Sequence, residues 1–231
     1  RDNSAACYNI AIGTCTLLTN TTGGRNVGIG HATLKCNETG SCNTGVGYAS
    51  LVLNTGGWNT GFGACTLYLN TTGNNNTATG YNSLLNNTTG NSNTAVGRCT
   101  LYNNISGSCN TAIGDVAGCS NTANQTVAVG FASLRTNTAS YSVAVGICAL
   151  YSNSGFRNTA LGFNVFRATN TGDDNIGAGY ESIRSNTSGG FNSAYGSQSL
   201  CNNTTGSCNT ALGYRSLYFN TAGADNTAVG N

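Results

Sequence analysis

The sequence predicts an all-β protein, a parallel β-solenoid (a β-roll or β-helix) of about 13 turns with a 16–17-residue repeat. Two observations predict it. A five-residue block, Asn226-Thr227-Ala228-Val229-Gly230, recurs at 93–97 and has near-copies along the whole chain. The glycines that close the blocks are 16 or 17 residues apart throughout: Gly13, Gly30, Gly47, Gly63, Gly80, Gly97, Gly114, Gly130, Gly146, Gly162, Gly179, Gly196, Gly213 and Gly230. So short a constant period indicates repeats that stack only on their neighbours.

Each block has the pattern of a short β-strand. Counting from the block Gly, the third residue before it is Thr, Val, Ile or Ser, and the residue directly before it is mostly Val, Ile or Leu. The residue between them is only Ala or Gly. Because side chains alternate between the two faces of a strand, one face carries β-branched side chains and the other is nearly bare. We expect the β-branched face to point into the interior.

A second short strand is expected around an apolar position four residues after each block Gly. Its side chains are predicted to stack in a ladder that faces the first strand, and each buried one contributes about 1.5–3 kcal/mol. Gly118 interrupts the ladder. The other members are Leu17, Leu34, Leu51, Leu67, Leu84, Leu101, Leu134, Leu150, Phe166, Ile183, Leu200 and Leu217.

A turn is predicted seven residues after each block Gly, where Asn stands in twelve of thirteen turns, with Thr169 as the exception. Gly follows two or three residues later in eleven of the thirteen, as in Asn-Thr-Thr-Gly. Asn forms local backbone hydrogen bonds in turns, and Gly adopts positive φ without strain. The Asn that opens each block also recurs from repeat to repeat. Stacked Asn side chains form hydrogen-bonded amide ladders along such an axis.

The composition argues against several classes of function. Charged residues are 7% of the 231, and the net charge of +2 is spread singly along the chain. The absence of a basic stripe disfavours nucleic acid as a partner, and no apolar run is long enough for membrane insertion. His31 is the only histidine and has no partner in the pattern. We therefore expect no enzyme, no catalytic residues, no cofactor and no metal site.

Eleven cysteines and many Asn-x-Ser/Thr sequons favour an extracellular or cell-surface location. The same motif is typical of tight turns, but the sequons at the turn position also predict a stripe of N-linked glycans. The predicted acceptors are Asn20, Asn37, Asn70, Asn87, Asn104, Asn186 and Asn203. Disulfides need nearby Cα atoms, so only cysteines of one turn or of adjacent turns can pair. We predict the bridges Cys36–Cys42, Cys109–Cys119 and Cys201–Cys208, and leave Cys7 as a free or intermolecular thiol.

The Asn-Thr-Ala-Val-Gly blocks followed by x-x-Ser-Leu resemble the head repeats of YadA-type trimeric adhesins and of similar phage tail-fibre proteins. The resemblance covers nearly the whole chain. It implies a parallel β-roll, association of three chains and a role in attachment. Here the repeat is longer by the Asn-Thr-Thr-Gly corner, and it is rich in cysteine.

The leading prediction for function is an extracellular structural protein, a glycosylated subunit of a filament. We expect residues 1–231 to form a single β-solenoid domain with uncapped ends, which stacks head to tail with copies of itself. A trimeric adhesin or tail-fibre segment is the first alternative. An ice-binding solenoid, with Thr and Asn ladders that order water, is the second.

Overall fold

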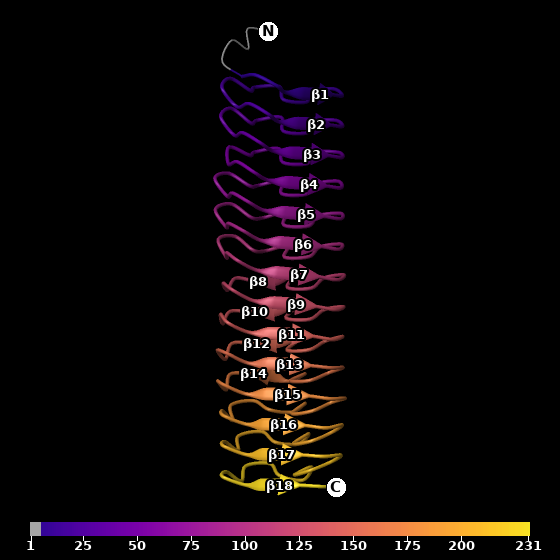
Figure 1. Cartoon of the computed structure of the whole chain (residues 1–231), viewed down its shortest axis with the longest axis vertical. Coiled ribbons are helices and arrows are strands. Elements are labelled where there is room, and N and C mark those ends of the chain that lie inside the picture. The colour runs from indigo at the N-terminus through magenta and orange to yellow at the C-terminus, as the bar shows by residue number, and fades with distance from the viewer. Residues whose placement is uncertain (1–5) are drawn as a thin grey trace. The chain divides into compact units, whose positions relative to one another are not determined.

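The computed structural model describes residues 6–231 and confirms a parallel β-solenoid of about 13 turns with a repeat of 16 or 17 residues. The chain divides into two compact units, Arg1–Thr122 and Ala123–Asn231. Within each unit, the strands of successive coils lie in register one above the next (Figure 1). The described residues contain no helix.

In the first unit, seven three-residue strands form one parallel sheet in chain order. They are β1 (Ile10–Ile12), β2 (Val27–Ile29), β3 (Thr44–Val46), β4 (Thr60–Phe62), β5 (Thr77–Thr79), β6 (Thr94–Val96) and β7 (Thr111–Ile113). The two-residue strand β8 (Ser120–Asn121) closes this unit. The register places equivalent residues of the repeat opposite each other, for example Thr77 opposite Thr94.

The second unit repeats this arrangement. Its larger parallel sheet contains β9 (Val127–Val129), β11 (Val143–Val145), β13 (Thr159–Leu161), β15 (Ile176–Ala178), β16 (Ser193–Tyr195), β17 (Thr210–Leu212) and β18 (Thr227–Val229). A smaller parallel sheet follows the corner asparagines and contains β10 (Thr136–Asn137), β12 (Ser152–Asn153) and β14 (Thr169–Asn170).

The strands face the opposite way to our prediction. The central Ala or Gly of the strand points inward, and Ala78 and Ala95 are fully buried. The β-branched residues on either side lie at the surface, as in β6, where Thr94 is half-buried and Val96 is exposed. The reason is lack of space. A Cβ added at Gly45 would lie 2.6 Å from the Thr33 Cγ2 atom, so the opposing wall leaves room for a methyl group at most.

The apolar position after each block Gly does form a buried ladder, and Leu34, Leu51, Leu67 and Leu84 have no exposed surface. The second strand expected there is absent, however, because these residues lie in a turn. Leu84 has a φ of 51°, and Asn82, two residues earlier, has a φ of 56°. Such left-handed conformations are uncommon outside Gly. Left-handed and ordinary backbone conformations alternate here, and this alternation reverses the direction of the chain. The backbone amides still donate hydrogen bonds to the next coil, as Leu84 N does to Thr100 O at 2.9 Å.

Candidate functional surfaces

Two ladders of asparagine side chains run inside each unit. In the corner ladder of the first unit, Asn70 Nδ2 donates to Asn54 Oδ1 at 2.6 Å and to Gly73 O at 2.9 Å. Asn87 Nδ2 then donates to Asn70 Oδ1 at 2.7 Å. The predicted amide ladder is therefore present. Both amide hydrogens of Asn70 are used inside the protein, which is the usual condition of a buried polar group.

The predicted glycan stripe does not fit this geometry. Six of the seven sequon asparagines have no exposed surface, and only Asn20 is half-buried. A glycan replaces a hydrogen on Nδ2, the atom that donates into the ladder. A glycan at Asn37, Asn70, Asn87, Asn104, Asn186 or Asn203 is thus incompatible with the folded coil.

The predicted disulfide bridges are also not formed. Within residues 6–231, no disulfide joins Cys36 to Cys42, Cys109 to Cys119, or Cys201 to Cys208. Cys201 is buried and Cys208 is exposed, so that pair lies in two different environments. Between Cys36 and Cys42, the corner closes around the Asn37 side chain, whose Nδ2 donates to Gly40 O at 2.8 Å. Cys7 is exposed, and burial raises the pKa of the Cys65 and Cys201 thiols.

Several of the ionisable residues make contacts between coils. The His31 ring stacks on Tyr48 in the next coil, with centroids 5.4 Å apart. Arg157 binds both carboxylate oxygens of Asp174 at 2.6 and 2.8 Å, and these hydrogen bonds lower the Asp174 pKa. Asp173 accepts a hydrogen bond from Phe156 N. Among the described residues, no three His, Cys, Asp or Glu side chains lie together as metal ligands would.

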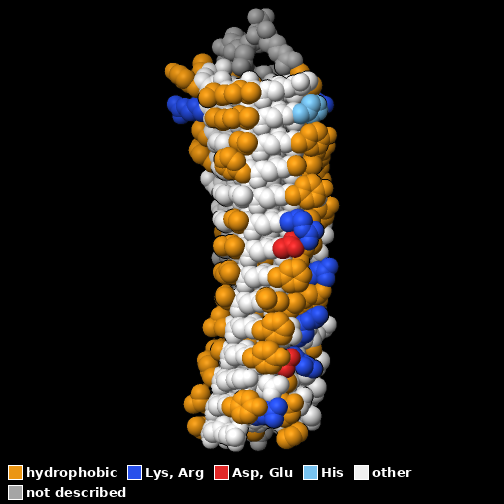
Figure 2. Space-filling view, turned by 90° about the vertical axis from the view of Figure 1, so that its right-hand side faces the viewer, with side chains coloured by type: hydrophobic (Ala, Val, Ile, Leu, Met, Phe, Trp, Pro, Cys, Tyr) orange, Lys and Arg blue, Asp and Glu red, His pale blue; other side chains and the backbone are white. Residues whose placement is uncertain are grey.

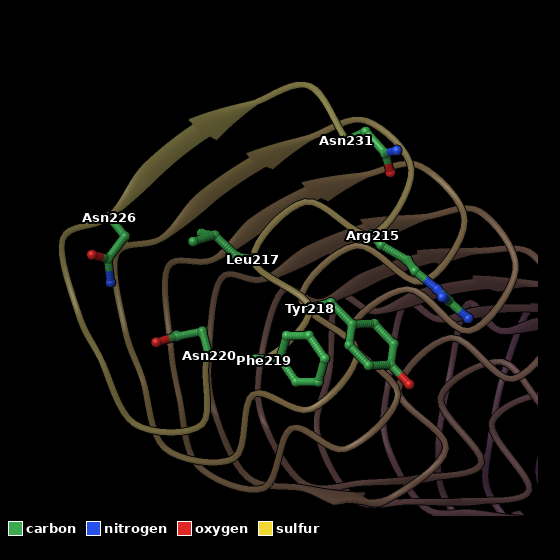
Figure 3. Close-up of a pocket in the computed structure, with 7 residues that line it drawn as sticks. All are labelled: Arg215, Leu217, Tyr218, Phe219, Asn220, Asn226 and Asn231. Atoms are coloured by element: carbon green, nitrogen blue, oxygen red, sulfur yellow. The ribbon is translucent and has the colours of Figure 1, made fainter.

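A hollow with a volume of about 610 Å³ lies at the last coil of the second unit (Figure 3). Its lining includes Leu217, Asn220 and Asn226, which occupy the ladder positions. One coil earlier, the equivalent Leu200 and Asn203 are fully buried, because a further coil packs on them. The hollow thus lies where, in the preceding coils, the following coil packs.

The outer faces carry repeating columns of exposed side chains. One column is the residue directly before each block Gly, and the neighbouring column is the residue directly after it. In the first unit these columns include Phe62 at 45% exposure and Tyr48 at 60%. Figure 2 shows hydrophobic side chains gathered in columns beside a band of uncharged polar side chains and backbone, with few charges between them.

None of the described residues forms a helix of the length and hydrophobicity that crossing a membrane requires. Comparison with known protein families, curated proteins and solved structures finds no match to this chain. The resemblance to YadA-type head repeats therefore stays a prediction that rests on the repeat motif alone.

The exposed columns were partly missed from the sequence, because the β-branched residues were assigned to the interior. The signal that locates them was present: the position between the β-branched residues holds only Ala or Gly, from the first block to the last. A side chain restricted to a methyl group or less is typical of a tightly packed interior.

Proposed function

We propose that this protein is a structural subunit that assembles with copies of itself into a filament through its exposed apolar columns. The observation that carries the proposal is the pair of columns that flank the block glycines. In the first unit the column before the glycines includes Ile29, Phe62, Val96 and Ile113, with Thr79 among them. The column after the glycines includes Tyr48 and Tyr81, but it also holds the charged residues Arg98 and Asp115. Large contiguous apolar patches on soluble proteins mark interaction sites.

A second copy of the chain is the partner that fits this surface best. Parallel strands keep neighbouring coils about 4.8 Å apart, so the side chains of two copies match over many coils once one coil is in register. The chain carries only 7% charged residues and a net charge of +2, so electrostatic repulsion between copies is weak. A partner of different architecture lacks this common spacing.

The extracellular location has less support than the assembly. It rested on sequons and on paired cysteines, but the sequon asparagines lie in the interior and the predicted bridges are absent. The trimeric alternative gains no support from the Ala and Gly positions, because they point inward and are not available for close contact between chains. The proposed assembly requires neither glycans nor disulfides.

Placing charges on an apolar column is expected to abolish assembly. We expect the wild-type protein to sediment as large species and to form filaments in electron micrographs. The variant Val96→Lys/Ile113→Lys should sediment as a monomer, because each association would bury lysines in an apolar contact. The matched control Thr89→Lys/Ser106→Lys adds the same charge at exposed corner positions and should still assemble. A wild-type protein that stays monomeric at high concentration contradicts the proposal, and discrete trimers favour the adhesin alternative.

Ice binding is a second candidate function, and one specific observation favours it. On the outer face of β3 to β7, five threonines lie opposite one another in register: Thr44, Thr60, Thr77, Thr94 and Thr111. A regular and uncharged column of hydroxyl and methyl groups presents a repeating surface to water. If it binds ice, the wild type will show thermal hysteresis and Thr77→Lys will show none, whereas Thr89→Lys will retain it. The absence of thermal hysteresis in the wild type removes this candidate.

A further inference from the structure

Four of the five arginines in the second unit lie on one connected strip of its surface. Arg135, Arg167 and Arg184 occupy the position five residues after their block glycines, in three of four successive coils, and Tyr151 occupies it in the coil between Arg135 and Arg167. Arg215 joins this strip through a hydrogen-bonded chain. Arg184 Nη1 binds Glu181 Oε1 at 3.1 Å, Gln198 Nε2 donates to Glu181 Oε2 at 3.2 Å, and Arg215 Nε donates to Gln198 Oε1 at 2.8 Å. We call these residues the arginine ladder.

The arginine ladder concentrates positive charge in an otherwise weakly charged protein. It holds four guanidinium groups and one carboxylate, an excess of three charges, whereas the whole chain has a net charge of +2. Within residues 6–231, no carboxylate lies within ion-pair distance of Arg167 or Arg215. This distinguishes them from Arg157 in the same unit, which is neutralised by Asp174. Arg167 and Arg215 are both exposed.

Aromatic rings hold these guanidinium groups in place. The Arg167 Cζ atom lies 3.9 Å from the centroid of the Tyr151 ring, and Arg135 of the coil before Tyr151 lies 5.6 Å from the same centroid and donates to its hydroxyl. Arg215 lies 5.2 Å from the Tyr214 ring and 5.1 Å from the Tyr218 ring. A guanidinium group stacked on a ring keeps its N–H donors at its edge available for an anion. The rings therefore fix the cations without neutralising them.

We propose that the arginine ladder binds an acidic polysaccharide along the coils of the second unit. Carboxylate and sulfate groups match the paired N–H donors of arginine. The ladder runs from coil to coil along the stacking direction, which suits a single extended polymer chain. Single-stranded nucleic acid fits less well, because its bases need open aromatic faces. Here the arginines of the two adjacent coils cover Tyr151. The proposal does not depend on self-association.

Titration of the folded protein with polygalacturonate and dextran sulfate tests the proposal, with neutral dextran and oligothymidylate as comparisons. We expect one or both acidic polysaccharides to bind, with an affinity that falls as salt is added. Arg167→Gln is expected to weaken binding about tenfold, since it removes a charge-assisted contact. The matched control Arg157→Gln removes one charge from the same unit and should leave binding unchanged. Arg167→Lys keeps the charge but loses the paired donors, so its binding should be intermediate.

Three results would overturn the proposal. The first is no binding of either acidic polysaccharide by the wild type at low salt. The second is equal weakening by Arg167→Gln and Arg157→Gln, which would show a response to overall charge. The third is tighter binding of oligothymidylate than of both polysaccharides. Thermal unfolding of each variant checks that the coil is intact, and Arg215→Gln, at the other end of the ladder, repeats the test if Arg167→Gln fails to fold. Binding by the monomeric Val96→Lys/Ile113→Lys variant separates this result from the outcome for assembly.

Discussion

Replacing Gly97 with alanine is expected to destabilise the first unit by about 3 kcal/mol or more. Gly97 directly follows β6 and has a φ of 134°, a conformation that residues with a Cβ rarely adopt. A Cβ at this position would lie 2.5 Å from the carbonyl oxygen of Gly114 in the next coil. Because that oxygen belongs to the backbone, the clash is relieved only by separating the two coils. Urea unfolding measures the loss, and amide hydrogen exchange should show it first in the coils on either side.

Gly118→Ala is the matched control for Gly97→Ala. Gly118 has a φ of 57°, close to the values that leucines adopt at the equivalent position of other coils. Its added Cβ would meet the Cδ2 atom of Leu101 at 2.9 Å, the end of a side chain that is able to move. We expect a loss well below that of Gly97→Ala. Equal losses for the two variants would show that the loss of glycine itself, and not the contact between coils, sets the cost.

The solenoid fold could be predicted from the sequence because the repeat length and the recurring glycines have the same physical cause, the close contact between successive coils. Every block glycine described has a φ between 117° and 136°. Within each unit, a Cβ added to a block glycine would clash with the backbone of the block glycine in the next coil. This holds for the block glycines from Gly13 to Gly213 whose next coil lies in the same unit. A position that admits only Gly once per coil must recur at the coil length. The spacing of 16 or 17 residues therefore reports the architecture directly, with no need for a family relationship.

The direction of the side chains could not be predicted in the same way. An alternation such as Thr94-Ala95-Val96 is equally compatible with either face inside, and the preference for burying valine favours the wrong one. The outcome depends on the thickness of the coil, which is set by the opposite wall. Thr33 and Leu51, for example, fill the space that a larger side chain at Gly45 would need. That is a tertiary constraint, and a single repeat read in isolation does not contain it.

The candidate sites were harder to predict than the fold. The motif at Asn70 satisfies the rule for a glycan acceptor and the rule for a tight turn at once, and only the inward direction of its amide separates the two. Sequence proximity also suggested pairing of Cys201 with Cys208, but one of these thiols is buried and the other exposed. The arginine ladder was missed because its successive arginines are 17 to 32 residues apart in sequence. The coil brings them together.

Replacing Asn76 with aspartate should destabilise the protein by about 3 kcal/mol or more at neutral pH. Asn76 is fully buried in the ladder of block asparagines. Its Nδ2 donates to Gly90 O at 2.8 Å and to Asn59 Oδ1 at 3.2 Å, and its Oδ1 accepts from Asn93 N at 2.9 Å. A carboxylate keeps the acceptor but loses both donors. Its second oxygen would face two other acceptors, and its charge would lie in the interior without a partner.

This variant should also make stability depend on pH with a definite sign. Burial disfavours the charged form, so the pKa of the new carboxyl group is higher in the folded state than in the unfolded state. The unfolded chain then releases its proton at a lower pH than the folded chain does. The loss of stability caused by the substitution therefore grows as pH rises and is complete above the folded-state pKa. As pH falls through that pKa, the folded variant takes up the proton, regains one donor and recovers part of the lost stability. Urea unfolding at pH 7.5 and pH 4.5, with the wild type as reference at each pH, measures the change.

The control is the adjacent Asn75→Asp, which makes the same chemical change at an exposed position with a φ of 58°. Asn and Asp both tolerate this left-handed conformation, so we expect a change within about 0.5 kcal/mol at either pH. If Asn76→Asp were as mild as Asn75→Asp, the ladder amides would not be the buried network on which this fold depends. A large loss for Asn76→Asp alone, reduced at low pH, would show that the asparagines hold the coils together from inside.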